Sequence, residues 1–320
     1  MSYLTKREKV LVLIGPTAVG KTKLSIEIAK AFNCEIISGD SMQIYRGMDI
    51  GTAKIKKEEM DGIPHHLIDI KEPHENFSVA EFQELVRRKI TEIHARGKIP
   101  FIVGGTGLYI QAVLYDYEFP DDSYDPELRQ KLMDEVDEKG IEHFYQKLMA
   151  VDPVKAKKIH PNNKRRIVRA LEVYYTTGET MSAISAKQKK EPIYDCLIIG
   201  LTMDREKLYE RINARVDQMM DEGLLDEVKR LYEMDLKDVS ATQAIGYKEL
   251  FEYFEGKVSL EEAVENLKRN TRRFAKRQLT WFKNKMTVEW FDVTEGAKQD
   301  EIFHKINGFL AGMQGFKANT

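Results

Sequence analysis

A glycine-rich segment near the N-terminus constrains the fold of this chain more than any other feature. It fills the pattern G-x-x-x-x-G-K-[ST] with eight consecutive residues: Gly15, Pro16, Thr17, Ala18, Val19, Gly20, Lys21 and Thr22. The apolar run 10–14 precedes it and suits a strand buried on both faces, and residues 24–29 follow it with helical character. A strand, a glycine-rich turn and a helix in this order predict a P-loop. A plain glycine-rich turn is the alternative.

A P-loop in this position is a phosphate-binding structure. Its glycines let the backbone curl so that several N–H groups point at one anion, and the positive end of the helix dipole adds to the attraction. Lys21 is expected to reach the terminal phosphate, and the Thr22 hydroxyl is expected to coordinate Mg²⁺. The loop therefore predicts a di- or triphosphate ligand with Mg²⁺ as cofactor, and leaves open which ligand it is.

Composition and length narrow the class of protein. The chain has 320 residues, enough for one large α/β domain or for two domains. No apolar run approaches the roughly 18 residues of a membrane span, and residues 1–9 contain no signal-peptide core. The two cysteines, Cys34 and Cys196, are too few and too distant for a zinc site. We expect a soluble cytoplasmic protein without membrane association, and no protein partner is predicted.

Further apolar strands are predicted at residues 35–38, 100–103 and 194–201. Their alternation with helices predicts an α/β fold, a P-loop NTPase-like parallel sheet flanked by helices. Asp40 follows the second strand, and Thr106 follows the third. Because ligands bind beyond the carboxyl ends of parallel strands, both side chains are expected near the P-loop.

The middle of the chain changes character. Residues 117 to about 177 predict helices and no strand, so we expect a helical insertion domain at 117–190 within a core of 1–116 and 191–320. Outside the insertion, the sequence predicts a helix at 78–96 with Ser78 as N-cap, a last long helix at 259–284 and a short strand at 288–291. The last helix carries an expected apolar stripe of Leu260, Val264, Leu267, Phe274 and Trp281.

Charge is segregated along a chain whose formal net charge is only −2. Residues 152–169 hold seven Lys and Arg against one acid, and residues 268–285 hold eight and no acid. Such segregation is typical of a protein that binds a polyanion. Two solvated helix faces are the alternative interpretation.

The glycine-rich turn after the third predicted strand argues against an ordinary NTPase. Most P-loop proteins that use a triphosphate have a downstream strand that ends in Asp, but here the candidate strand ends in Gly104, Gly105 and Thr106. The nearest acid is Asp40, after the preceding strand, in a position that suits a group facing an acceptor substrate. A P-loop kinase acting on a nucleoside or another small metabolite is still an alternative on these residues.

Longer motifs make the chain recognisable. It resembles the tRNA dimethylallyltransferases, the isopentenyltransferase family that prenylates tRNA. The stretches that carry the resemblance are residues 15–22, 40–45, 47–54, 64–69, 104–109, 162–172 and 275–281. They follow the family's order and cover nearly the whole chain. The bacterial form is the better fit, because the cysteines of the eukaryotic C-terminal zinc finger are absent.

The resemblance implies a prenyl transfer reaction. A dimethylallyl group would pass from dimethylallyl diphosphate to N6 of the adenosine 3′ of the anticodon in tRNA, and diphosphate would leave. Asp40 matches the family's general base, and the other expected catalytic residues are Thr17, Lys21 and Thr106. The P-loop would then hold the leaving diphosphate. Arg211 and Arg215, four residues apart on a predicted helix, are expected to complete the clamp, with ordinary surface charge as the alternative.

The resemblance also places contacts with the tRNA anticodon stem-loop. The expected residues are Asp40, Ser41, Met42, Gln43, Thr106, Arg129, Arg165, Arg166, Ile167, Val168, Arg169, Gln243, Ala244, Ile245, Gly246, Tyr247, Lys248, Lys276, Arg277, Gln278, Trp281 and Lys283. Both basic clusters overlap these stretches. The pair His65 and His66 could suggest a metal site, but a structural role is the better interpretation because no further ligand stands nearby in the sequence.

Overall fold

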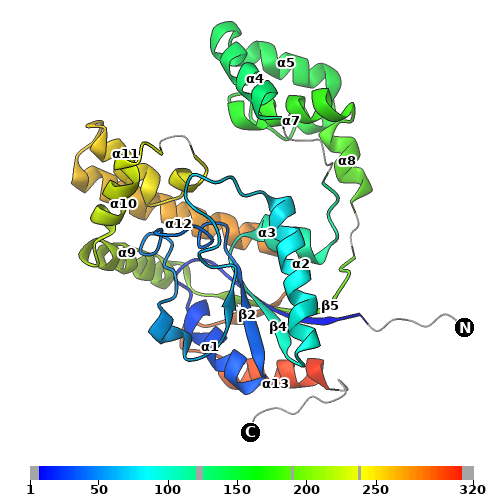
Figure 1. The fold of residues 1–320 in the computed structure, drawn as a ribbon, viewed down its shortest axis with the longest axis vertical. Coiled ribbons are helices and arrows are strands. Elements are labelled where there is room, and N and C mark those ends of the chain that lie inside the picture. Colours follow the sequence, from blue (N-terminus) through cyan, green and yellow to red (C-terminus); the bar gives the residue numbers. More distant parts are fainter. Residues whose placement is uncertain (1–6, 120–124, 189–190, 237–238, 312–320) are drawn as a thin grey trace, which may run out of the picture. The chain divides into compact units, whose positions relative to one another are not determined.

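The computed structural model describes residues 7–119, 125–188, 191–236 and 239–311 (Figure 1). The chain divides into two compact units. The larger unit combines the residues up to 114 with those from 192 onward, and the smaller unit comprises residues 115–191. We describe each unit by itself.

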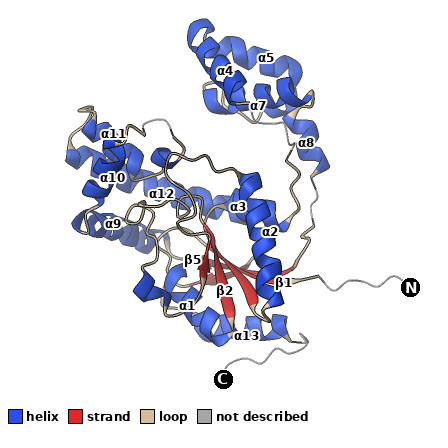
Figure 2. Cartoon of the chain, viewed as in Figure 1, coloured by secondary structure: helices blue, strands red, loops and turns tan. Residues whose placement is uncertain are grey.

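The larger unit is built on one six-stranded sheet with the strand order β3-β2-β4-β1-β5-β6. Figure 2 shows strands of this sheet in red, with helices around them. The strands are β1 (Lys9–Ile14), β2 (Cys34–Gly39), β3 (His65–His66), β4 (Ile99–Gly104), β5 (Asp195–Thr202) and β6 (Glu289–Asp292). All neighbouring strands pair in parallel, which confirms the predicted α/β class. The sequence did not predict β3, because two residues are too short to show a periodicity.

Helices flank this sheet and connect its strands. They are α1 (Lys21–Ala31), α2 (Val79–Ala95), α3 (Gly107–Leu114), α9 (Arg205–Asp221), α10 (Leu224–Glu233), α11 (Tyr247–Phe254), α12 (Leu260–Lys285) and α13 (Gln299–Leu310), with the 3₁₀ turns η1 (Lys57–Met60) and η2 (Ala241–Gln243). Ser78 caps α2 by accepting the N–H of Glu81, as predicted, and Ser259 caps α12 in the same way. None of the described helices is long and apolar enough to cross a membrane.

The core of the larger unit lies on the faces of the sheet. Alternate residues of β1, such as Leu11 and Leu13, pack with α1 and α13 in one cluster of fully buried apolar side chains. A second cluster joins residues 44–48 to α9, α10, α11 and α12, with Tyr45 and Tyr247 among its largest buried side chains. Because this second cluster anchors the segment after β2, it fixes the surroundings of Asp40.

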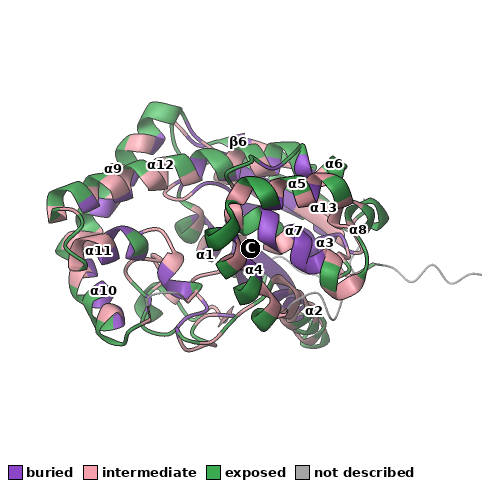
Figure 3. Cartoon of the chain, turned by 90° about the horizontal axis from the view of Figure 1, so that it is seen from above, coloured by how far each residue is buried: buried purple, intermediate pink, exposed green. Residues whose placement is uncertain are grey.

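The inner face of α12 differs from the predicted apolar stripe. Its buried residues are Ala263, Leu267, Ala275, Gln278 and Phe282, whereas the larger apolar residues of the expected stripe are half-buried apart from Leu267. Figure 3 colours α12 by burial and shows that its exposure varies along the helix. The expectation selected bulky residues and missed the small and polar ones. Gln278 and Trp281 of α12 pack closely against the glycine turn after β4, Gln278 on Gly105 and Trp281 on Gly107.

The smaller unit consists of helices in the residues that the structure describes. They are α4 (Pro126–Lys139), α5 (Ile141–Val151), α6 (Pro153–Ala156), α7 (Lys164–Thr177) and α8 (Met181–Lys187). Its core gathers Leu132, Phe144, Leu148 and Ile167, with Ile167 on the inner face of α7. Asp125 and Asn163 cap α4 and α7 by accepting backbone N–H groups, so each helix begins where its cap residue dictates.

Candidate active site

The P-loop connects the end of β1 to α1. Gly20, at the N-cap of α1, has a left-handed backbone with φ 104°, and it offers no side chain to cap the helix. The N–H groups of the first turn therefore have no side-chain cap and can bind an anion. Gly15 is required for space, because a Cβ there would lie 2.9 Å from the carbonyl oxygen of Leu201 in the neighbouring strand.

Lys21 is held inside this loop. Its Nζ donates hydrogen bonds to the carbonyl oxygens of Gly15 at 2.9 Å and Pro16 at 2.8 Å. Burial lowers the pKa of Lys21 to about 7, although the charge of Asp40 acts in the opposite direction; the charge of Arg215 lowers it further. A cationic side chain with a depressed pKa, next to open helix N–H groups, is suited to bind an anion that restores its charge.

Asp40 forms a tight turn directly after β2. Its Oδ1 accepts hydrogen bonds from the backbone N–H of Met42 at 2.8 Å and of Gln43 at 3.4 Å. Burial raises the pKa of Asp40, while these two hydrogen bonds and the charge of Lys21 oppose the shift. Oδ2 takes no hydrogen bond from the described residues, so this oxygen is available to accept a proton.

Thr106 joins the turn after β4 to the Asp40 turn. Its Oγ1 accepts the backbone N–H of Ser41 at 3.1 Å, and its own N–H donates to the carbonyl oxygen of Gly39 at 3.2 Å. β2 and β4 lie so close here that a Cβ on Gly104 would be 2.3 Å from the carbonyl oxygen of Gly39. The structure thus brings the Asp40 and Thr106 turns together at one edge of the sheet.

Gln43 extends the Asp40 turn toward residues 47–54. Its Oε1 accepts the hydroxyl of Ser38 at 3.0 Å, and its Nε2 donates to the carbonyl oxygens of Thr52 at 3.2 Å and Ala53 at 3.4 Å. This side chain is therefore engaged within the protein. Met42 and Ser41 are partly exposed beside it.

Glu227 on α10 anchors the 47–54 segment, a role that no sequence pattern predicted. Its buried carboxylate accepts the backbone N–H groups of Asp49 at 2.9 Å, Ile50 at 2.8 Å and Gly51 at 3.0 Å. It also accepts the hydroxyl of Tyr247 at 2.6 Å. A glutamate on an amphipathic helix usually faces solvent, so only the fold distinguishes Glu227 from its exposed neighbours.

Gln278 connects α12 to two of the loops. Its Oε1 accepts the N–H of Thr17 in the P-loop at 3.0 Å, and its Nε2 donates to the carbonyl oxygen of Gly105 at 3.0 Å. One turn further along the helix, Trp281 packs on Gly107 so closely that a Cβ there would lie 2.3 Å from its Cδ1 atom. This arrangement corrects the expectation for Gln278, whose amide is committed inside the protein.

The two candidate arginines of α9 differ in position. Arg215 is half-buried, its pKa is lowered by that burial, and its charge acts on Lys21. Arg211 is exposed, and it has no hydrogen bond or ion pair with any described residue. The structure therefore places Arg215 beside the P-loop lysine and gives no corresponding placement for Arg211.

The basic cluster on α12 has two different halves. In the first half, Lys268 pairs with Asp217 at 2.7 Å and Glu265 at 3.5 Å, and Arg272 donates to Asn213. In the second half, four cations are exposed and make no ion pair with the described residues; they are Lys276, Arg277, Lys283 and Lys285. The charge of Lys268 is therefore neutralised by its acidic partners, whereas the cations of the second half carry free positive charge.

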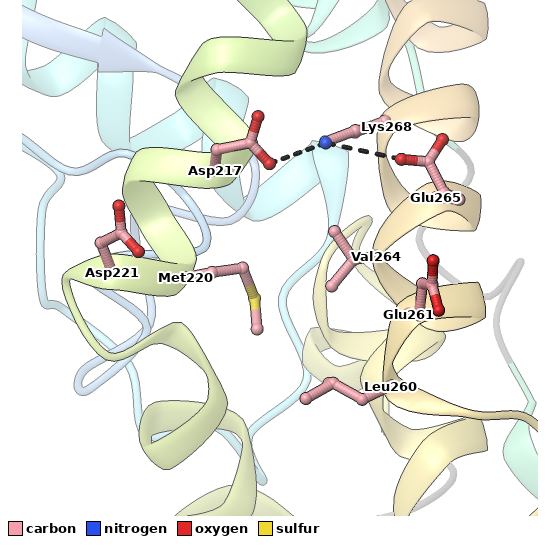
Figure 4. Close-up of a pocket in the computed structure, with 8 residues that line it drawn as sticks. All are labelled: Asp217, Met220, Asp221, Leu260, Glu261, Val264, Glu265 and Lys268. Carbon is pink, nitrogen blue, oxygen red and sulfur yellow. Dashed lines mark ion pairs between the residues drawn. The ribbon is translucent and has the colours of Figure 1, made fainter.

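A groove between α9 and α12 explains why Lys268 is paired (Figure 4). Its volume is about 550 Å³, and its lining consists of Asp217, Met220, Asp221, Leu260, Glu261, Val264, Glu265 and Lys268. Four of these side chains are carboxylates, and the single cation is paired with two of them. Such a lining repels phosphate, so the groove is not a candidate for the diphosphate or RNA site.

Residues 243–248 begin α11. Lys248 is exposed, and Gln243, Ala244 and Ile245 are half-buried. The Gly246 N–H donates to the buried carboxylate of Glu249 at 2.8 Å. Tyr247 is fully buried, and burial raises the pKa of its hydroxyl, which donates to a carboxylate of α10. The expectation of an RNA contact is thus corrected for the Tyr247 side chain, which belongs to the core.

In the helical unit, the expected RNA residues fall into two groups. Ile167 and Val168 are buried core side chains, which corrects the expectation that they reach RNA. Arg129 and Arg169 both pair with Glu172, at 2.8 Å and 3.1 Å, and that carboxylate has no exposed surface. Because removing one partner would leave a buried charge, these arginines stabilise the unit. The exposed cations at the start of α7 are Arg165 and Arg166.

The histidine pair lies in β3 and has a structural partner. His66 Nε2 lies 2.7 Å from the buried carboxylate of Glu35. Burial opposes ionisation of Glu35, but hydrogen bonds from Arg96, His66 and Lys98 outweigh it and lower its pKa to about 2. Among the described residues, no group of three or more His, Cys, Asp or Glu side chains could hold a metal ion. The contacts of His66 agree with the structural interpretation.

Comparison with known protein families shows which family this chain belongs to. The family model for IPP transferase matches residues 43–285, well over half of the chain. The chain belongs to the IPP transferase family. This confirms the resemblance found in the motifs, and it overturns the kinase alternative because the family that matches is that of the IPP transferases.

Curated and solved relatives of this IPP transferase agree with the family assignment. A tRNA dimethylallyltransferase of Bacillus cereus (strain AH187) is 64% identical over 95% of this chain and 96% of its own length. The solved tRNA isopentenylpyrophosphate transferase of Bacillus halodurans is 54% identical, covers 96% of each chain and has a TM-score of 0.71. A eukaryotic dimethylallyltransferase, solved acting on tRNA, is 33% identical over 98% of this chain and 81% of its own, with a TM-score of 0.80.

Proposed function

We propose that this enzyme is a tRNA dimethylallyltransferase. It transfers a dimethylallyl group from dimethylallyl diphosphate to N6 of the adenosine 3′ of the anticodon and releases diphosphate. The observation that carries the proposal is the meeting of a phosphate-binding loop, a half-buried carboxylate and a threonine turn at one sheet edge, in Lys21, Asp40 and Thr106. Relatives of the same family, named for this reaction, support it.

The P-loop residues act on the leaving group. When the allylic C–O bond breaks, positive charge develops on carbon and negative charge on the diphosphate oxygens. Lys21 and the first-turn N–H groups of α1 stabilise that negative charge as it forms. Arg215 adds a second positive charge on the same side, since its charge already acts on Lys21.

Asp40 and Thr106 act on the acceptor. The N6 lone pair forms the new C–N bond, and the amine proton passes to Asp40 Oδ2, because Oδ1 is held by the turn. Burial raises the pKa of Asp40 and makes it a better proton acceptor than an exposed carboxylate. The Thr106 hydroxyl fixes the neighbouring turn for the incoming base. The adenosine must leave its stack to reach this edge.

Thr22 is the residue that would hold Mg²⁺. It stands in the first turn of α1, directly after Lys21, and it is exposed. Magnesium in phosphate-transfer sites typically keeps several waters and takes only one or two protein oxygens besides the substrate phosphates, so a single hydroxyl beside a diphosphate loop fits it. The bound ion would neutralise charge on the leaving oxygens.

The RNA surface consists of exposed cations. We assign it to Lys248 on α11, to Lys276, Arg277 and Lys283 on α12, and to Arg165 and Arg166 on α7. Such side chains bind the phosphates of an anticodon stem-loop and displace counterions. We place the reaction in the cytoplasm, where tRNA is modified in a bacterial cell.

Incubation with labelled dimethylallyl diphosphate and unmodified tRNA tests the function, with ATP turnover measured in parallel. Label should enter the RNA and ATP should persist; ATP turnover without labelled RNA would refute the proposal. Asp40→Asn should lower kcat by about 10²–10⁴-fold and leave tRNA affinity nearly unchanged. Asp300→Asn, on the exposed start of α13, is the matched control and should retain full activity.

Salt titration tests the RNA surface. Lys276→Gln should weaken tRNA binding and reduce the slope of log affinity against log salt by about 1, because one phosphate contact is lost. Lys268→Gln is the matched control on the same helix, since this lysine is already paired with two carboxylates. Equal effects of the two substitutions would contradict the assignment of the second half of α12 to the RNA surface.

A further inference from the structure

We propose that Gln278 is a positioning residue that holds the donor loop and the acceptor turn in one fixed arrangement. Its amide bridges the backbone of Thr17 in the P-loop and of Gly105 in the turn after β4. The proposal rests on the proposed function, because it assigns the donor diphosphate to the P-loop. It gives Gln278 a role inside the protein in place of a contact with RNA.

Burial and hydrogen bonding support this assignment. Gln278 is buried, with only 7% of its surface exposed. Its acceptor oxygen and its donor nitrogen are both engaged, each at 3.0 Å, with backbone groups of two different loops. No other described side chain makes hydrogen bonds to both of these loops. An amide is required for this bridge, because one end must accept and the other must donate.

The contact with Thr17 acts on a strained part of the P-loop. The Thr17 N–H donates to Gln278, so this N–H is already engaged within the protein. The next residue, Ala18, holds a positive φ of 64°, which residues other than glycine rarely adopt. Such a conformation persists only where its surroundings enforce it. The hydrogen bond to Gln278 is one of the constraints that can do so.

The contact with Gly105 is also steric. A Cβ at residue 105 would lie 2.2 Å from Nε2 of Gln278, while its next contacts would be ordinary. The backbone of Gly105 is not left-handed, so the glycine is required for space alone. The Gln278 amide can therefore occupy this position only because residue 105 has no side chain.

Binding of inorganic diphosphate, measured by calorimetry, tests the role of Gln278. In Gln278→Ala we expect affinity for diphosphate to fall about tenfold, with tRNA affinity within about twofold of wild type. With both substrates, KM for the donor should rise about tenfold while kcat changes by less than about threefold. Gln278→Glu should show a partial loss, because a carboxylate accepts the Thr17 N–H but cannot donate to Gly105.

A double-mutant cycle separates positioning from general destabilisation. Gly105→Ala should weaken diphosphate binding about tenfold in the wild-type background and by less than about twofold in Gln278→Ala, because the shorter side chain makes room for the added methyl group. Gly308→Ala on α13, where an added Cβ meets no atom within 4 Å, is the matched control and should leave diphosphate affinity unchanged.

Three outcomes would overturn the proposal. They are a loss of tRNA affinity larger than the loss of diphosphate affinity in Gln278→Ala, unchanged diphosphate affinity in that variant, and an equal effect of Gly105→Ala in both backgrounds. The diphosphate titration needs no prenyl transfer. A wild-type enzyme that binds diphosphate but does not prenylate tRNA would therefore contradict the proposed function and leave the role of Gln278 to be decided by the cycle.

Discussion

The two glycine-rich turns of the active-site edge resemble each other in sequence and differ in physics. In the P-loop, Gly20 adopts a left-handed backbone, and a Cβ there would meet no atom within 4 Å. In the turn after β4, Gly104, Gly105 and Gly107 have no left-handed backbone, but a Cβ on any of them would overlap a neighbour. One turn needs glycine mainly for its conformation, and the other needs it for space.

This difference tells what each turn contributes. The left-handed Gly20 aims backbone N–H groups at an anion, so the first turn is a binding device. The second turn is a packing device, because its glycines let β2, Gln278 and Trp281 approach the backbone. Together they hold the carboxylate of Asp40 and the P-loop lysine at one edge. Four predictions follow from the contrast between the two turns.

The largest effect is expected from the charge of the first turn. Lys21→Met should weaken diphosphate binding by at least about 100-fold, because a buried charge-assisted contact to phosphate is lost. Thr106→Val in the second turn should leave diphosphate affinity within about threefold and lower kcat with tRNA. Calorimetry with inorganic diphosphate and steady-state kinetics measure the two effects. Similar losses of diphosphate affinity in both variants would contradict the claim that the first turn binds the diphosphate and the second does not.

The second prediction concerns folding stability. Gly104→Ala should destabilise the protein by about 3 kcal/mol, because the new Cβ meets the backbone of Gly39 at 2.3 Å and strands cannot yield as a side chain can. Gly20→Ala should cost about 1–2 kcal/mol, the strain of a left-handed alanine in open space. Urea unfolding of both variants gives the comparison. A larger loss for Gly20→Ala would reverse the assigned roles.

Much of this site could be predicted from the sequence, and the reasons are local. The P-loop pattern and Asp40 after the second strand depend on residues that are close in the chain, and the parallel order of the strands follows from short crossovers. The family motifs added a catalytic role for Thr106 and RNA contacts for the basic stretches, both of which strand ends and charge had already singled out.

The rest depends on contacts between distant residues. Gln278 lies 261 residues from Thr17, and Glu227 lies 178 residues from Asp49, so no local pattern shows that these side chains meet. Helical periodicity based on bulky residues also placed Trp281 rather than Gln278 on the buried face of α12. Gln278 and Trp281 both pack on glycines of the turn after β4, a contact between distant segments that the sequence of the helix alone does not predict.

The third prediction follows from the lowered pKa of Lys21, which is about 7. Near pH 8 most of this side chain is neutral, and a bound diphosphate should restore its charge, so binding takes up about 0.9 proton and weakens as pH rises above about 7. Without ligand, the unfolded state binds more protons between about pH 7 and 10.5, so this lysine makes folding more favourable as pH rises through that range.

Calorimetry in buffers of different ionisation enthalpy measures the proton uptake. Lys21→Arg is the matched variant, because arginine stays charged and shows only the proton uptake of the ligand itself. The difference between wild type and Lys21→Arg should approach one proton at pH 8 and vanish at pH 5.5. An equal uptake in both proteins would show that Lys21 is already charged without ligand, and would assign the pH dependence to the diphosphate.

The smallest effect is expected where the second turn packs on an aromatic ring. Trp281 lies against Gly107, and its buried Nε1–H has no hydrogen-bond partner among the described residues. In Trp281→Phe the lost ring contact is offset by removal of this unsatisfied donor, so the free energy of unfolding should change by less than about 1 kcal/mol. Trp281→Ala should cost about 3 kcal/mol, because the contact itself disappears. A large loss in the phenylalanine variant would mean that the indole N–H, and not the ring contact, supports the turn.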